Sequence, residues 1–183
     1  LNLSQGIKIE HFYNQRGLRA QIYQAVRNHA IVIAASGNDN LPNQYYPASF
    51  NDHMVLKVGA SNSNGLRWMD EIGVLGSSWD NRVDVVAPGT SDLFTGLSHV
   101  ANDVYTNNGS GTSVSTAVVS GIASLLCSEH NIENTQSTYP NNLAPEDIEH
   151  ILQETAKDVV TSQSGVGYDN RTGFGIVNAQ DAL

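Results

Sequence analysis

Positive charge is scarce in this chain of 183 residues. Nine lysines and arginines stand against eighteen aspartates and glutamates, which gives a net charge of −9. Surfaces that bind nucleic acid or anionic membranes need clustered positive charge, so this balance argues against both kinds of partner. The acidic excess is better interpreted as a surface that keeps the protein in solution.

Cysteine and long apolar runs are scarce as well. Cys127 is the only cysteine, which excludes an intrachain disulfide without identifying the compartment. It ends the apolar run 122–127, so a buried helix position is a better interpretation than a reactive thiol. No run approaches the roughly 18 apolar residues of a membrane span. Zinc-ligand spacing and phosphate-loop motifs are also absent from the sequence, and no metal ligand is assigned.

Short apolar runs alternate with helical patterns, as in α/β proteins. The spacing of Leu18, Ile22, Ala25 and Val26 predicts an amphipathic helix over 17–29. The run 31–35 is too short for a helix and is typical of a strand buried on both faces of a parallel sheet. Further strands are expected over 55–60 and 83–87, and further helices over 112–127, from Pro145 and after Asn178. The sequence shows neither a repeat nor a domain linker, so one domain is expected.

The sequence also predicts how deeply one helix is buried and where one loop lies. The helix over 112–127 is rich in small residues and apolar nearly all round, which predicts burial on every side. The stretch 131–142 is polar and is expected to form a surface loop.

The start of the helix over 112–127 is a candidate catalytic site. Ser113 would lie where unpaired backbone N–H groups and the helix dipole favour negative charge. An oxyanion formed on a carbonyl attacked by this serine would be stabilised there. The glycines just before it, Gly109 and Gly111, allow a substrate backbone to come close. A serine N-cap behind a glycine-rich turn explains the same segment equally well.

Asn38 is the second candidate. It follows the strand over 31–35 at its C-terminal end, and ligands of open α/β sheets bind in the crevice outside such ends. Its side-chain amide could donate a hydrogen bond to a developing oxyanion, or Asn38 could be an ordinary turn residue.

Together these segments resemble the subtilisin-like serine proteases, the subtilases, and the resemblance runs along the whole chain. Gly111-Thr112-Ser113 is similar to the nucleophile motif of that family, and Ser36-Gly37-Asn38 to its oxyanion motif. The remaining motifs occur in the family's order: Leu1-Asn2-Leu3-Ser4-Gln5-Gly6, Tyr46-Pro47-Ala48, Val58-Gly59-Ala60, Val85-Val86-Ala87-Pro88-Gly89 and Gly173-Phe174-Gly175-Ile176-Val177-Asn178. By contrast, Ser115 replaces the final glycine of the Gly-x-Ser-x-Gly elbow of α/β-hydrolases.

The resemblance implies a three-layer α/β fold with a mainly parallel sheet and its N-terminal part missing. Residues 1–183 would then be the C-terminal portion of a single catalytic domain. The implied activity is that of a serine endopeptidase that forms an acyl intermediate on Ser113, with the oxyanion held by Asn38 and the Ser113 N–H. The substrate-binding residues that it implies are Leu3, Ser4, Gln5, Gly6, Ala34, Ala35, Ser36, Gly37 and Thr112. The small Ala35 and Ser36 predict room for a sizeable P1 side chain, and the family places a cis bond at Tyr46–Pro47.

The catalytic aspartate and histidine precede the serine in subtilisin, so both are expected upstream of Leu1. None of the six histidines has the His-Gly-Thr setting of the family: His11, His29, His53, His99, His130 and His150. Ala117 also stands where the family usually has proline. The chain alone is therefore expected to be inactive. The alternative is a degenerate or truncated module that serves binding or assembly without catalysis.

The expected partners are a peptide or protein substrate and a polypeptide that covers the sheet edge. That polypeptide is either the missing N-terminal half or a second copy of the chain. The resemblance allows calcium in the complete enzyme but gives no cofactor in this chain, and it favours a secreted or cell-surface location.

Overall fold

The central sheet of the computed structural model consists of four parallel strands. The structure describes residues 1–8, 15–42, 45–50, 54–90, 92–95, 105–130, 143–162 and 164–183. The strands are β1 (Asn2–Leu3), β3 (Ile33–Ala35), β5 (Leu56–Ser61) and β6 (Val85–Pro88), in the order β1-β3-β5-β6. Leu3 pairs with Ala34 and Val58 pairs with Val85. Parallel strands align their carboxyl ends, so the segments after β3, β5 and β6 all leave the sheet at one edge.

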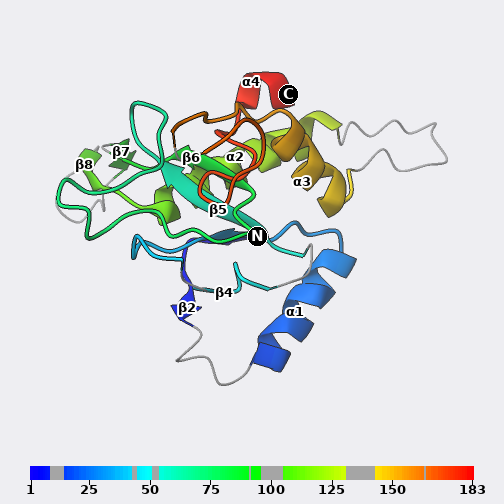
Figure 1. The fold of residues 1–183 in the computed structure, drawn as a ribbon. Coiled ribbons are helices and arrows are strands. Elements are labelled where there is room, and N and C mark those ends of the chain that lie inside the picture. Colours follow the sequence, from blue (N-terminus) through cyan, green and yellow to red (C-terminus); the bar gives the residue numbers. More distant parts are fainter. Residues whose placement is uncertain are drawn as a thin grey trace.

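Helices cover both faces of this sheet, which makes three layers (Figure 1). Helix α1 (Gln15–Arg27) buries Ile22 against a core with Val32, Ala34 and Val55. The opposite face is covered by α2 (Thr112–His130), α3 (Pro145–Glu154) and the short α4 (Ala179–Ala182). The expected three-layer α/β fold is confirmed.

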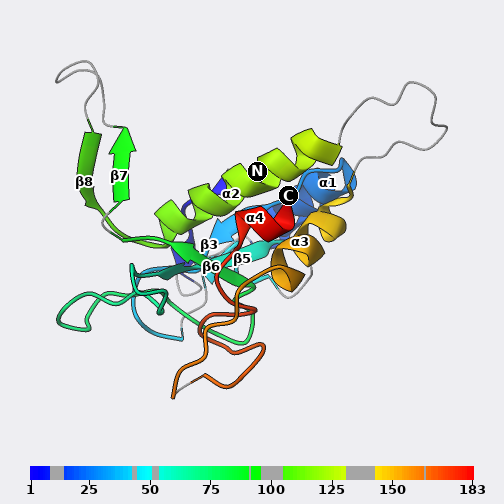
Figure 2. The ribbon, with the colours of Figure 1, turned by 90° about the horizontal axis from the view of Figure 1, so that it is seen from above.

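Two antiparallel pairs complete the described strands. Strand β2 (Ile7–Lys8) pairs with β4 (Tyr45–Tyr46). Strand β7 (Asp92–Thr95) pairs with β8 (Tyr105–Gly109), and this hairpin stands out from the layers in Figure 2. The sequence did not predict β7 and β8, because neither segment has an alternating apolar pattern.

The predicted helices and the strands of the parallel sheet are confirmed, with shifted ends. Residue 31 precedes β3, and β6 runs from Val85 to Pro88 instead of from residue 83 to 87. Asn178 caps α4 by accepting hydrogen bonds from the N–H groups of Gln180 and Asp181, at 3.1 and 3.3 Å. The Tyr46–Pro47 bond is cis, as expected. The polar stretch 131–142 lies outside the described residues.

The prediction that α2 is buried on every side is wrong. Its residues Val119, Ile122 and Leu126 pack on the sheet. The opposite face exposes apolar side chains: Val118 is 37% exposed and Leu125 is 53% exposed. The described parts of the chain place no layer over this face.

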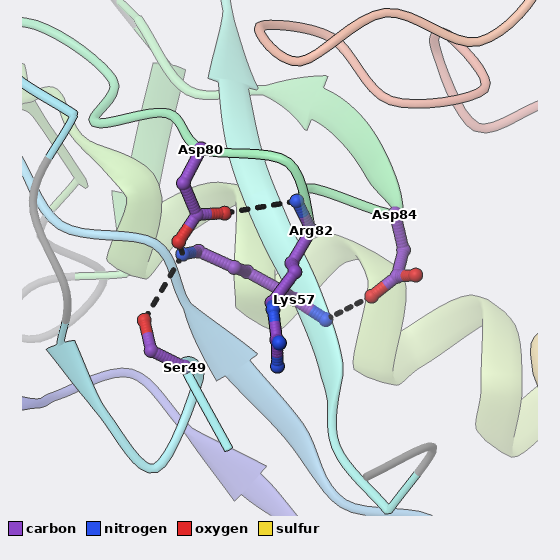
Figure 3. A network of polar contacts seen from close by, with 5 residues as sticks. All are labelled: Ser49, Lys57, Asp80, Arg82 and Asp84. Carbon is purple, nitrogen blue, oxygen red and sulfur yellow. Dashed lines mark hydrogen bonds and ion pairs between the residues drawn. The ribbon is translucent and has the colours of Figure 1, made fainter. Parts of the chain in front are cut away.

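A lysine lies in the middle of β5, although this strand is buried along its whole length. The Lys57 ammonium group donates to Asp80 Oδ2 at 2.6 Å and to Ser49 Oγ at 3.2 Å (Figure 3). Its backbone N–H donates to Asp84 Oδ2 at 2.6 Å. Burial lowers the pKa of Lys57, and Asp80 opposes that effect. The network joins the strand to the segment that leads into β6.

No helix in the described ranges has the length and apolar character that crossing a membrane requires.

Candidate active site

The end of β6 holds the first turn of α2, in which Ser113 lies. The N–H of Gly111 donates to Gly89 O at 2.7 Å, and Ser115 Oγ donates to Ala87 O at 2.8 Å. A Cβ atom on Gly89 would lie 2.4 Å from Ser115 Oγ, so residue 89 must lack a side chain for this approach. Gly111 has a φ of +140°, a conformation open mainly to glycine. These contacts place Ser113 at the carboxyl end of the parallel strands.

Thr112 connects this turn to the segment that follows β3. Asn38 Oδ1 accepts hydrogen bonds from the N–H and from the hydroxyl of Thr112, both at 2.9 Å. The Thr112 hydroxyl in turn accepts a hydrogen bond from the N–H of Gly37 at 3.3 Å. Because the amide oxygen of Asn38 is engaged in this way, its Nδ2 group is oriented away from Thr112 and can donate to another acceptor.

Ser113 and Ser4 form a reciprocal pair of hydrogen bonds. Ser113 Oγ donates to Ser4 O, and Ser4 Oγ donates to Ser113 O, each at 2.8 Å. The segment after β1 is thereby held against the first turn of α2. The nucleophile candidate and Asn38 both line one open cavity of about 160 Å³, together with Gln5, Gly6, Ala35, Gly37, Asp39, Tyr45 and Thr112.

Most of the predicted site residues therefore meet at one place. Of the predicted residues, Leu3, Ser4, Ala34 and Ser36 do not line the cavity, although Ser4 is hydrogen-bonded to Ser113. Leu3 and Ala34 pair in the sheet and pack in the core beneath α1. Ser36 is fully buried, and its hydroxyl has no hydrogen-bond partner among the described residues. The part that these four residues take in substrate binding stays a prediction.

The described histidines do not approach Ser113. His29 follows α1 and His150 lies on α3, and both are exposed. His130 ends α2, which by the rise of a helix puts its backbone roughly 25 Å from Ser113. His11, His53 and His99 lie outside the described residues.

Three residues near the cavity were not predicted from the sequence. Lys8 Nζ lies 2.6 Å from Asp39 Oδ2, and the Tyr45 hydroxyl donates to the same oxygen at 2.7 Å. Burial, and next the hydrogen bond to Asp39, raise the pKa of Tyr45 to about 12. The hydrogen bond with Asp39 is the main reason why the pKa of Lys8 is raised. Two signals could have pointed to the cluster: Asp39 directly follows Asn38, and Tyr45 directly precedes Tyr46-Pro47.

This arrangement combines a serine with donors for an oxyanion. The N–H of Ser113, in the first turn of α2, and the Asn38 amide can stabilise negative charge on a carbonyl oxygen. The described part of the chain gathers no group of three or more His, Cys, Asp or Glu side chains that could hold a metal ion.

Known proteins share both the sequence pattern and the fold. The model of the subtilase family matches residues 1–175. Halolysin of Haloferax mediterranei is 31% identical, over 84% of the chain and 24% of that protein. M-protease of Shouchella clausii is 28% identical, over 90% of the chain and 36% of that protein. The chain thus spans well under half the length of these two relatives.

Solved structures agree. The prenylagaramide maturation protease PagA is 26% identical and superposes with a TM-score of 0.72, over 99% of this chain and 59% of that one. The patellamide maturation protease PatA, at 24% identity and a TM-score of 0.76, shares the fold over 99% of this chain and 60% of its own. On this evidence the chain belongs to the subtilase family.

Proposed function

We propose that this chain is the nucleophile-bearing part of a serine endopeptidase. One observation carries the proposal: Thr112 ties Asn38 to the turn that presents Ser113, so that a nucleophile and two kinds of oxyanion donor line one cavity. Family membership supports the same reaction class.

In the proposed reaction, a peptide carbonyl enters the cavity and Ser113 Oγ attacks its carbon. A histidine accepts the hydroxyl proton, and an aspartate orients that histidine. The Asn38 amide and the backbone N–H of Ser113 hold the resulting oxyanion. The histidine passes the proton to the leaving amine, and water then hydrolyses the acyl-enzyme by the same route.

We infer that the histidine and the aspartate come from polypeptide other than residues 1–183. In this chain Ser113 Oγ donates to a backbone carbonyl instead of a base. A serine without a general base is a weak nucleophile. Loss of triad members in subtilisin itself leaves only ~10³ to 10⁴-fold acceleration over water. The chain alone therefore does not hydrolyse peptides at an appreciable rate.

A fluorophosphonate probe tests this directly. The purified chain should resist labelling, as should its Ser113→Ala variant. Rapid labelling that disappears in Ser113→Ala would show that the chain contains its own base and would refute the proposed inactivity.

We infer that the polypeptide that supplies the histidine packs on the exposed face of α2. Ser113, Ala117 and Gly121 follow one another at four-residue spacing and so share one side of the helix. Ala117 and Gly121 are exposed, as are the neighbouring Val118 and Leu125. A segment that packs on this apolar stripe lies beside Ser113 and can present a histidine to it. We propose the N-terminal half of a subtilase domain as its occupant, in preference to a second copy of the chain.

Sequencing the gene upstream of Leu1 is the first test, and Asp and His motifs there favour the enzyme. Substituted residues at those positions favour a module that binds without catalysis. Co-expression with the upstream polypeptide should restore probe labelling of Ser113. Leu125→Glu should weaken that restoration, whereas Leu66→Glu, at a residue with similar exposure away from α2, should not. Sedimentation that shows a stable dimer which excludes the upstream polypeptide would identify a second copy as the occupant instead.

A further inference from the structure

The ring of Tyr45 lies between the two segments that flank the cavity at Ser113. A Cβ atom added to Gly37 would lie 2.4 Å from Cδ2 and Cε2 of the Tyr45 ring. A Cβ atom added to Gly6 would lie 3.1 Å from Cβ and 3.3 Å from Cδ1 of the same tyrosine. Both glycines line the cavity, as does Tyr45 itself. The ring thus occupies space that the absence of two side chains leaves open.

Two polar contacts hold this ring in place. The Tyr45 hydroxyl donates to Asp39 Oδ2 at 2.7 Å, and Lys8 Nζ lies 2.6 Å from the same oxygen. Lys8 and Tyr45 are also direct cross-strand partners in the β2–β4 pair. The ammonium group lies 5.9 Å from the centre of the Tyr45 ring, within the range of a cation–π contact. Asp39 and Lys8 therefore fix both the hydroxyl end and the face of the ring.

The remaining volume is small for a substrate. An engineered cavity of about 150 Å³ is known to hold a benzene ring. The cavity here measures about 160 Å³. It must admit the scissile carbonyl near Asn38 and Ser113 as well as the adjoining side chain. A large P1 side chain and the reacting backbone together exceed that space.

We infer that Tyr45, tethered by Asp39 and Lys8, closes the side-chain pocket beside Ser113 and restricts it to small residues such as alanine or serine. This inference rests on the proposed peptidase function. It departs from the prediction of a sizeable P1 side chain, which considered only the small Ala35 and Ser36. Tyr45 is a specificity-determining residue here and takes no part in the chemical step.

The test is peptide binding to this chain, which needs no catalysis. Two N-acetylated tripeptide acids that differ only in a C-terminal alanine or phenylalanine are titrated into the ¹⁵N-labelled chain. The amide signals of Gly6, Gly37 and Asn38 report on the cavity. The same titrations are made with Tyr45→Gly and with Tyr45→Phe, which keeps the ring but loses the hydroxyl. Tyr23→Ala, at an exposed tyrosine on α1, is the control.

The alanine peptide should bind the unaltered chain more tightly than the phenylalanine peptide, by about 10-fold or more. Tyr45→Gly should reverse that order, and Tyr45→Phe and Tyr23→Ala should keep it. If both peptides shift these amides in the unaltered chain with equal affinity, the inference about the pocket is wrong, while the proposed peptidase function is not affected. This comparison uses only the unaltered chain, so it can be made even if Tyr45→Gly does not fold. If the control also reversed the order, the effect would not belong to the pocket. If neither peptide shifts these amides in the unaltered chain or in folded Tyr45→Gly, the proposed peptidase function fails, and the inference fails with it.

Discussion

Replacement of Asp80 by asparagine isolates a buried lysine in the centre of the sheet. The Lys57 side chain is 1% exposed, and its ammonium group forms an ion pair with the Asp80 carboxylate at 2.6 Å. Ser49 Oγ at 3.2 Å is a neutral partner that remains in the variant (Figure 3). Removal of one member of a buried pair leaves an uncompensated charge and usually destabilises a protein by about 3–5 kcal/mol.

The chemistry of lysine sets an upper bound on this loss. Lys57 can escape the penalty by losing its proton, and from an ordinary pKa near 10.4 that step costs about 4.6 kcal/mol at neutral pH. The expected loss is about 3–4 kcal/mol, which lies within the usual range for a broken buried pair and below this bound. Burial already lowers the pKa of Lys57 in the unaltered chain, and in the variant the folded-state pKa falls further below the unfolded value. The variant should therefore regain stability as pH rises from the folded value toward about 10.

Urea unfolding of the chain at several pH values measures the effect. Lys8→Met is the matched control, because Lys8 makes an ion pair of the same 2.6 Å length but is 41% exposed. Its removal should change stability much less than Asp80→Asn does, because solvent screens an exposed ion pair. The double variant Lys57→Met with Asp80→Asn should recover most of the loss. A loss under about 1 kcal/mol in Asp80→Asn would show that Lys57 is not held as a buried cation.

Three further changes have defined outcomes. Burial raises the pKa of Asp84 to about 7, so the folded state takes up a proton there that the unfolded state does not. The unfolding free energy should rise by about 2 kcal/mol between about pH 8 and about pH 5.5, and Asp84→Asn should abolish that rise in urea titrations; a persistent rise would assign it to another group. Ser115→Ala removes the bonds to Ala87 O and Pro88 O and should lower the unfolding free energy by about 1–2 kcal/mol, whereas an unchanged melting temperature would contradict the anchoring role. In the complete enzyme, Asn38→Ala should lower kcat about 10² to 10³-fold, the range known for this kind of donor in subtilisin itself, and a change mainly in KM would make Asn38 a binding residue.

Sequence patterns were sufficient for the layers of the fold and for the pairing of Ser113 with Asn38. Burial of one helix face requires apolar residues at helical spacing, as at Leu18, Ile22 and Val26, and burial of a strand on both faces requires a short apolar run, as at 31–35. Both patterns can therefore be recognised in the sequence. Local patterns placed Ser113 at the amino end of a helix and Asn38 after the carboxyl end of a strand, and the resemblance to the subtilase family brought the two into one site. Short-range rules therefore reached the candidates, and the resemblance paired them.

Contacts between distant side chains were beyond those rules. In a strand pattern a lysine normally marks a solvent-facing position, and only the loops that carry Ser49 and Asp80 make Lys57 a buried residue. The place of Tyr45 depends on the pairing of β2 with β4 and on two glycines from different segments. Neither the burial of Lys57 nor the position of Tyr45 produces a periodic pattern in the sequence.

The wrong prediction for α2 draws attention to the apolar side of this helix that the described structure leaves exposed. Apolar residues all round a helix predicted burial, and the described structure buries only the side that carries Val119 and Leu126. An exposed apolar stripe on a chain of net charge −9 is costly to keep in water, so its composition favours a partner over a solvated surface. The stripe runs from Leu125 through Gly121 and Ala117 to Ser113 itself. A partner that relieves the exposure therefore also reaches the nucleophile, and the same packing that stabilises the fold would complete the catalytic site.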